Sequence, residues 1–169
     1  LFAAYVQAKQ EQNVLDYDDL LLFWADMVSE PTLGAEVGGR FDHVLVDEYQ
    51  DTNPLQATVL LGLKPDGRGV TVVGDDAQSI YSFRGADAEA LLGFPDRYPG
   101  ATIYRLETNY RSTPEILRLA DASIAHNSRR YEKTLVATRE SGVPVAVVGA
   151  RDLAQQAEFV AQRVLELRD

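Results

Sequence analysis

Residues 44–53 read VLVDEYQDTN, and this stretch decides the fold class because an apolar run ends in two adjacent carboxylates. A short Val- and Leu-rich run is typical of a strand buried in a parallel sheet, and we predict one over residues 41–47. Asn53 followed by Pro54 predicts the start of a helix, with asparagine as N-cap and proline at the first helical position. We expect this helix to continue to about residue 63.

The same order of strand and helix repeats along the chain. Apolar runs predict further strands, and periodic apolar residues with N-cap signals predict helices between them. Polar, glycine-rich residues 30–40 predict a loop. The further strands are expected over residues 70–74, 102–106 and 143–150, and the helices over residues 1–8, 20–28, 54–63, 87–97, 114–127 and 152–169. This alternation indicates an α/β fold, a parallel sheet with helices on both faces.

The composition limits the class of protein. With no cysteine among 169 residues, a disulfide framework and a cysteine-based zinc site are excluded. No signal peptide or long apolar run is present, and we expect a cytoplasmic protein with no membrane partner. The formal net charge is −10, and residues 1–110 carry 18 acidic and 7 basic side chains. Acidic surfaces repel phosphate backbones, so charge alone argues against nucleic acid.

Asp47 and Glu48 are the first candidates for chemistry. Ligands gather at the carboxyl ends of the strands in a parallel sheet, and there a nucleotide hydrolase needs one group for its metal and one for its attacking water. Asp47 would hold Mg²⁺ directly or through water, and Glu48 would orient and deprotonate the water. The alternative is two solvated acids that follow a strand.

Four motifs resemble those of the UvrD/Rep superfamily 1 DNA helicases. They occur in the family's order, with its spacing, and cover roughly residues 14–135. They read LDYDDLL at 15–21, DEYQDTN at 47–53, VGDDAQSIYSFRGA at 73–86 and LETNYRS at 106–112. The resemblance implies a RecA-like P-loop NTPase core with ATP and Mg²⁺ as cofactors, and the adjacent Asp47 and Glu48 as its metal site.

The resemblance also implies roles at the nucleotide. Gln78 would bond the γ-phosphate and sense its loss, Arg111 would be an arginine finger, and Tyr110 would stack on the adenine. Each side chain has a structural alternative. Gln78 would cap a surface turn, Arg111 would pair with Glu107 or Glu115, and Tyr110 would be part of the core.

DNA contacts are implied for the third motif. Tyr81 and Phe83 would stack on the bases of single-stranded DNA, which needs few basic residues and no sequence code. Many family members carry tryptophan where this chain has Phe83, so stacking is expected to persist on a smaller face. Arg84 would pair with Glu48 or the phosphates and link the ATP state to the DNA site. The alternative for both aromatic side chains is burial in the core.

The acids of the first motif are spaced like the ligands of a metal ion. Asp16, Asp18 and Asp19 open the helix expected over 20–28, where carboxylates favour the positive end of the helix dipole. We therefore expect Asp16 or Asp18 to cap this helix, and we assign the cluster no metal.

One family motif is missing from the 169 residues. No segment reads G-x-x-x-x-G-K-S/T, so the loop that cradles the β- and γ-phosphates is absent. The only methionine is Met27, and we expect a fragment that does not hydrolyse ATP by itself. We assign residues 1–29 to the end of a helical subdomain inserted in the first core domain, and 30–127 to the second half of that RecA-like domain. Residues 128–142 are the expected linker, and 143–169 the start of the second RecA-like domain.

The leading interpretation is part of an ATP-dependent DNA helicase in DNA repair or replication. It would couple ATP hydrolysis to translocation on single-stranded DNA and to unwinding at duplex junctions, with repair proteins as further partners. The resemblance implies 3′→5′ polarity. Two alternatives remain at this point, the helicase subunit of a helicase-nuclease complex and a non-catalytic module that binds nucleic acid or protein.

Overall fold

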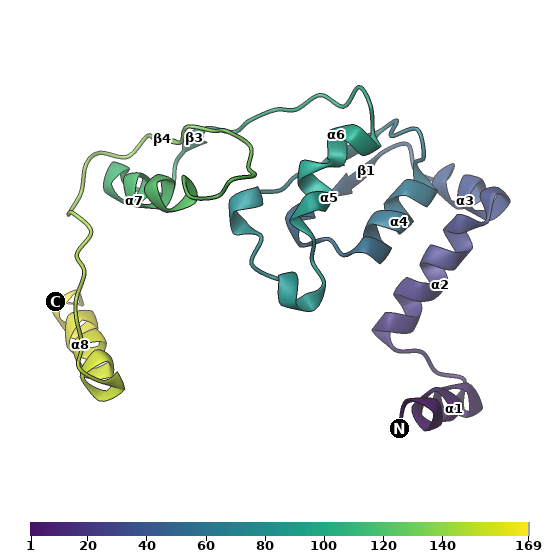
Figure 1. The fold of residues 1–169 in the computed structure, drawn as a ribbon, viewed down its shortest axis with the longest axis horizontal. Helices are drawn as coiled ribbons and strands as arrows, with labels where there is room; N and C mark the ends of the chain where they lie inside the picture. The colour runs from purple at the N-terminus through teal and green to yellow at the C-terminus, as the bar shows by residue number, and fades with distance from the viewer. Residues whose placement is uncertain (169) are drawn as a thin grey trace. The chain divides into compact units, whose positions relative to one another are not determined.

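A computed structural model describes residues 1–168, apart from the side chains of Arg84 and Ala88, and the chain divides into two compact units (Figure 1). Unit 1 comprises Leu1–Arg105 and Asn127–Glu132, and unit 2 comprises Leu106–His126 and the chain from Lys133 onward. Both units combine helices with a small parallel sheet. Within the described residues, no helix has the length and apolarity needed to cross a membrane.

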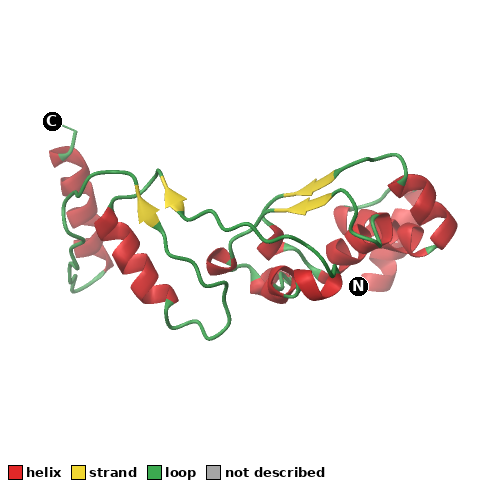
Figure 2. Ribbon diagram, turned by 90° about the horizontal axis from the view of Figure 1, so that it is seen from above, coloured by secondary structure: helices red, strands yellow, loops and turns green. Residues whose placement is uncertain are grey.

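The sheet of unit 1 confirms the predicted strand before the paired carboxylates. Strand β1 (Val44–Val46) pairs in parallel with β2 (Val70–Val72), as the two longer arrows in Figure 2 show. In this register Val44 lies opposite Val70. Parallel neighbours need a crossover, and α4 (Pro54–Leu63) supplies it. Asn53 caps α4 in a capping box with Gln56, as the Asn-Pro pair predicts.

Three helices precede the sheet, namely α1 (Phe2–Gln12), α2 (Tyr17–Ser29) and α3 (Pro31–Gly38). The predicted loop over residues 30–40 is wrong, because Glu30 caps α3 and Pro31 occupies its first turn. Its glycines serve close packing. A Cβ on Gly34 would lie 2.6 Å from the carbonyl oxygen of Val28, and one on Gly38 would collide with the carbonyl oxygen of Leu63.

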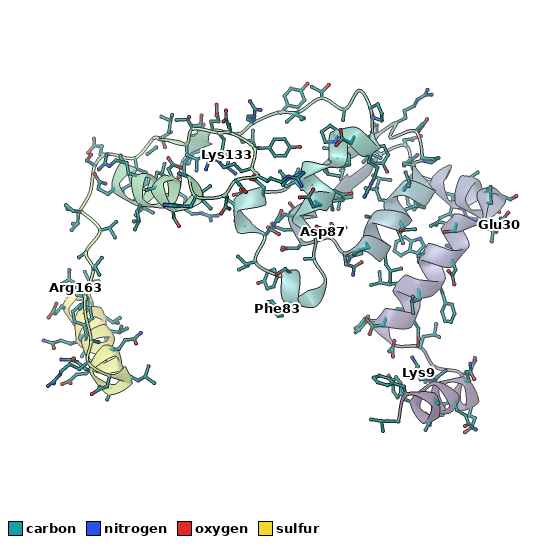
Figure 3. All side chains as sticks on the ribbon, viewed as in Figure 1. Lys9, Glu30, Phe83, Asp87, Lys133 and Arg163 are labelled. Carbon is teal, nitrogen blue, oxygen red and sulfur yellow. The ribbon has the colours of Figure 1, made fainter. Side chains whose placement is uncertain are left out.

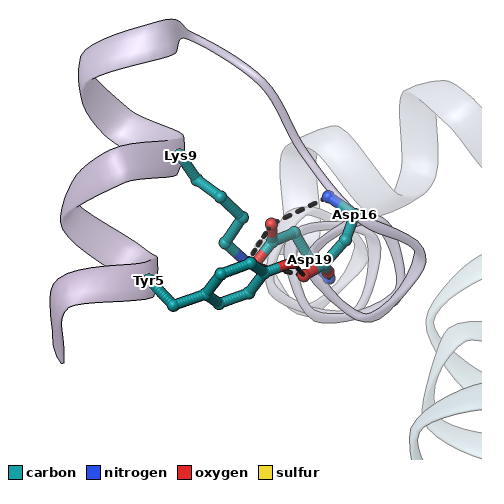
Figure 4. A network of polar contacts seen from close by, with 4 residues as sticks. All are labelled: Tyr5, Lys9, Asp16 and Asp19. Atoms are coloured by element: carbon teal, nitrogen blue, oxygen red, sulfur yellow. Dashed lines mark hydrogen bonds and ion pairs between the residues drawn. The ribbon is translucent and has the colours of Figure 1, made fainter. Parts of the chain in front are cut away.

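The turn between α1 and α2 is held by charged side chains (Figure 4). Asp16 caps α2 in a capping box with Asp19, which decides between the two predicted caps. Lys9 Nζ lies 2.8 Å from Asp16 and 2.6 Å from Asp19, and the Tyr5 hydroxyl donates to Asp16. The Lys9 ammonium lowers the pKa of Asp16 below its usual range, and Asp16 in turn raises the pKa of Lys9. The acids therefore tie two helices together.

Two apolar clusters form the core of unit 1. Ala25, Val28, Val59 and Leu63 join α2 to α4, while Tyr49, Leu60, Ala90 and Leu91 lie beneath the sheet. The Tyr49 ring meets the Phe94 ring edge to face, with centroids 5.5 Å apart. Tyr131 packs on this second cluster and donates its backbone N–H to Asp76, which attaches residues 127–132 to unit 1.

The helix predicted over residues 87–97 is two helices, α5 (Ala88–Leu92) and α6 (Phe94–Arg97). Pro95 lies in the first turn of α6 and has no backbone N–H to continue the hydrogen bonding of α5. Gly93 forms the joint between them.

Unit 2 contains helices α7 (Pro114–Ile124) and α8 (Leu153–Glu166) and the strands β3 (Thr108–Asn109) and β4 (Val136–Ala137), which pair in parallel. Thr113 and Asp152 are the N-caps, as the predicted helix starts require. The strands predicted over 102–106 and 143–150 are wrong. Neither run pairs with another strand among the described residues, and several apolar side chains of both runs are exposed.

Candidate active site

The parallel pairing of β1 and β2 brings two of the four motifs to the same edge of the sheet. The Val73 N–H donates to the Val46 carbonyl, and the Tyr49 N–H donates back to the Val73 carbonyl, at 2.8 and 2.9 Å. The residues that follow both strands are therefore neighbours. This is the edge where ligands gather in parallel α/β sheets.

Asp47 and Glu48 follow β1 and are both exposed. The backbone of Glu48 has φ 50° and ψ 42°, the left-handed region that a side chain rarely adopts, at a cost of about 1 kcal/mol or more. The buried Tyr49, which begins η1 (Tyr49–Asp51), and the Asp47 carboxylate, which accepts the Glu48 N–H at 2.9 Å, hold this conformation. The bend turns two consecutive carboxylates out of the sheet.

The donor set fits Mg²⁺ that arrives with a nucleotide. Neither carboxylate forms an ion pair with another described side chain, and both are accessible to solvent. No group of three or more acidic, histidine or cysteine side chains with metal-site geometry occurs among the described residues. Mg²⁺ is commonly held by one or two carboxylates together with waters and phosphate oxygens, so two carboxylates are enough.

Gln50 joins the two motifs, and the sequence interpretation did not single it out. Its side chain is 1% exposed. Nε2 donates to Glu48 Oε2 at 2.6 Å, and Oε1 accepts the backbone N–H of Asp75 at 2.9 Å. Gly74 leaves room for this amide, because a Cβ there would lie 2.8 Å from Gln50 Oε1. The contact between Gln50 and Asp75 forms only when the two strands are paired. The presence of a glutamine in the motif was therefore the only signal for it in the sequence.

Gln78 ends the short helical turn η2 (Asp76–Gln78) after β2, at the predicted strand-to-helix turn. It is exposed, and its Nε2 donates to the Asp75 carboxylate at 2.8 Å. The Asp75 carboxylate also accepts the Ala77 N–H, at 3.1 Å. The Gln78 amide therefore caps a surface turn, which is the structural alternative given for it above. Its role toward phosphate stays a prediction.

The predicted DNA contacts lie just beyond this turn. Tyr81 precedes η3 (Ser82–Arg84), and the Tyr81 and Phe83 rings lie 6.0 Å apart at 50°. Phe83, labelled in Figure 3, is 75% exposed and Tyr81 39%, so the alternative that both are core residues is wrong. The Arg84 side chain, expected to pair with Glu48 or the phosphates, lies outside the described residues.

Tyr110 and Arg111 belong to unit 2, whereas the other described candidates belong to unit 1. Asn109 Oδ1 accepts the backbone N–H groups of Arg111 and Ser112 and fixes the turn after β3. Tyr110 is 76% exposed, so its alternative as a core residue is wrong.

The ion pairs left open for Arg111 are also absent among the described residues. Glu107 accepts the backbone N–H of Thr134 at 2.8 Å. Glu115 pairs with Arg118 at 3.2 Å and accepts the Gly142 N–H, which lowers the pKa of Glu115 to about 2. Both acids therefore have other partners.

Comparison with known sequences covers the whole chain. Residues 1–99 match the UvrD/REP helicase N-terminal domain, and residues 104–169 match the UvrD-like helicase C-terminal domain. The chain belongs to the UvrD-like helicase family. The resemblance carried by the four motifs is thereby confirmed.

Relatives in this family carry helicase names. The chain is 36% identical to the ATP-dependent DNA helicase PcrA of Leuconostoc citreum and 37% identical to DNA helicase II of Escherichia coli K12, in both cases over all of this chain and 23% and 24% of those proteins. It is 39% identical to a putative ATP-dependent DNA helicase, YjcD, of Bacillus subtilis over 86% of this chain and 19% of that protein. The chain thus spans about a quarter of the length of the curated relatives it matches.

Proposed function

We propose that the full-length protein containing this chain is an ATP-dependent DNA helicase that uses ATP hydrolysis to translocate on single-stranded DNA and unwind duplex junctions, in repair or replication. The observation that carries the proposal is the hydrogen-bonded edge of unit 1, where the exposed carboxylates after β1 meet the turn that ends in Gln78. Family membership supports the proposal. The 3′→5′ polarity and the cytoplasmic location are part of it.

The hydrolytic roles fall to side chains at this edge. Asp47 would hold Mg²⁺, which when bound would neutralise charge on the phosphates. Glu48 would take a proton from the attacking water, and an exposed carboxylate next to the metal ligand has the access this needs. Gln78 would bond the γ-phosphate with its amide, whose Nε2 donates one N–H to Asp75 and has a second N–H to offer.

The remaining roles follow the family pattern. Arg111 would place its guanidinium against the charge that develops on the transferred phosphoryl group, and its freedom from ion pairs within the described residues suits an arginine finger. Tyr110 would stack on adenine with its exposed ring. Arg84 would link Glu48 or the phosphates to the DNA site.

Single-stranded DNA would bind at Tyr81 and Phe83. Their exposed rings offer faces to successive bases, and each stacked base contributes about 1–3 kcal/mol. Stacking of this kind suits a chain of net charge −10, because attraction between lysine or arginine and phosphate is not its main source of affinity.

The domain assignment is part of the same proposal. The small parallel sheet of unit 1 would belong to a RecA-like core with helices on both of its faces, to which residues 30–127 contribute the second half. Residues 1–29 would close an inserted helical subdomain, residues 128–142 would be the linker, and residues 143–169 would open the second RecA-like domain. Other parts of the full-length protein would supply the phosphate-binding loop.

The test compares ATP hydrolysis by the full-length protein and by the 169-residue chain, with Mg²⁺, in the presence and absence of single-stranded DNA. We expect DNA-stimulated turnover from the full-length protein and none from the chain alone. If the full-length protein does not hydrolyse ATP, the proposal is wrong, and a non-catalytic binding module becomes the better account.

A further inference from the structure

The buried amide of Gln50 lies between the two motifs of the candidate site. We propose that Gln50 is a positioning residue, which fixes the Glu48 carboxylate for water activation and ties it to the turn that carries Gln78. This inference rests on the proposed function, because it gives Glu48 a catalytic task.

The orientation of the amide is determined by its partners. The Asp75 backbone N–H is a donor, so the Gln50 atom that faces it at 2.9 Å must be the oxygen. Nε2 is therefore the atom that faces Glu48, and its bond of 2.6 Å to an ionised carboxylate is short and charge-assisted. Burial at 1% exposure and the closed space beside Gly74 prevent the amide from turning over.

The bond restricts one oxygen of Glu48 and leaves the other available. Glutamate side chains have several rotamers, and an exposed one samples them freely unless a contact selects one. Gln50 holds Oε2, while Oε1 has no hydrogen-bond partner among the described residues. Oε1 is thus the oxygen that can accept a proton from water.

The hydrogen bonds of the Gln50 amide also link Glu48 to Gln78. Gln50 Oε1 accepts from the Asp75 backbone, and the Asp75 carboxylate accepts from Gln78 Nε2 at 2.8 Å. The Ser79 hydroxyl also donates to the backbone carbonyl of Gln50, at 3.4 Å. Three hydrogen bonds therefore connect Glu48 to Gln78 through one buried side chain. If Gln78 exchanges its hydrogen bond to Asp75 for one to a phosphate, a shift of Asp75 is transmitted through Gln50 to the Glu48 carboxylate.

The experiment uses the full-length protein with Gln50→Met and Gln50→Glu, measured beside Glu48→Gln. Methionine fills the space but forms neither hydrogen bond, and we expect a loss in kcat of about 10–100-fold with the KM for ATP changed less than about 3-fold. Gln50→Glu keeps the length of the side chain but replaces the donating amide with a group that repels the Glu48 carboxylate, and we expect a similar loss in kcat with a similarly small change in KM.

A matched control is Gln56→Glu, which adds the same charge in the exposed capping box of α4 and should leave both kcat and the KM for ATP unchanged. If Glu48→Gln retains hydrolysis, the catalytic task of Glu48 and this inference are both wrong. If Glu48→Gln abolishes hydrolysis but a folded Gln50→Met or Gln50→Glu protein keeps the wild-type kcat, only the positioning role is overturned. Either variant decides this even where the other does not fold.

Discussion

Replacing Gly74 with alanine should destabilise unit 1, because Gly74 packs against the buried amide of Gln50. The new Cβ would lie 2.8 Å from Gln50 Oε1, 3.1 Å from Leu91 Cδ2 and 3.2 Å from the Gln50 backbone nitrogen. Overpacking of this kind costs about 1–3 kcal/mol. If the amide moves away from the Asp75 N–H, an unsatisfied buried group adds about 1–3 kcal/mol. We expect the free energy of unfolding to fall by about 1–3 kcal/mol if the amide stays in place and by about 2–6 kcal/mol if it moves.

Trp24 makes the measurement specific to unit 1, because it is the only tryptophan and lies in α2. Its fluorescence during urea unfolding of the 169-residue chain gives the midpoint. With a slope of about 2 kcal/mol per molar urea, a loss of about 2–6 kcal/mol lowers the midpoint by roughly 1–3 M. Gly149→Ala is the control, since a Cβ there meets nothing within 4 Å. A Gly74→Ala midpoint equal to that of the control would refute the packing argument.

Three further changes test other parts of the account. Asn53→Ala removes the side-chain cap of α4 and should cost about 1 kcal/mol in urea unfolding, whereas Asn53→Asp should keep most of it; equal losses would contradict the capping role. Phe83→Ala in the full-length protein should weaken single-stranded DNA binding by about 5–150-fold, in fluorescence anisotropy at fixed salt, without lowering basal ATP hydrolysis, and an unchanged affinity would remove Phe83 from the DNA site. The Gly142 amide should titrate by NMR with the pKa of Glu115, near 2 in the folded chain. Because this folded pKa is lowered from 4.5, the stabilisation is complete above about pH 4.5 and is lost as the pH falls toward 2. A midpoint near 4.5 would show that the contact with Gly142 is not formed.

Local patterns were enough to predict the parts of the fold that depend on neighbouring residues. Asn53 caps α4 as predicted, and Asp16, one of the two predicted caps, begins α2. Both use hydrogen bonds that span only three residues. The strand before Asp47 was also predicted, because a short Val- and Leu-rich run is typical of a strand in a parallel sheet.

Features that depend on distant residues were not predicted. The glycines of α3 suggested a loop, whereas they allow close contact with the backbone of α2 and α4. The runs at 102–106 and 143–150 have strand-like composition but no partner strand within the described residues. Composition alone does not supply the neighbouring backbone that a strand needs.

The candidate site was likewise predicted where it depends on neighbouring residues and missed where it depends on distant ones. The apolar run before Asp47 and Glu48 makes these acids candidates, and the family resemblance of the motifs adds Gln78. Gln50 was missed because its importance comes from Asp75, which lies 25 residues away in the chain and meets it only across the paired strands. The exposure of Phe83 is likewise a property of the folded chain, because an aromatic residue in a motif is as typical of a core as of a binding face.

The central claim is that Glu48 activates the water in ATP hydrolysis. The most direct measurement is the ATP affinity and single-turnover hydrolysis rate of full-length wild-type protein and Glu48→Gln, with Glu36→Gln, at an exposed position of α3, as a matched control. We predict that Glu48→Gln binds ATP within about 3-fold of wild type while its hydrolysis rate falls by about 10²–10⁴-fold, and that the control matches wild type. Hydrolysis by Glu48→Gln at the wild-type rate would contradict the account.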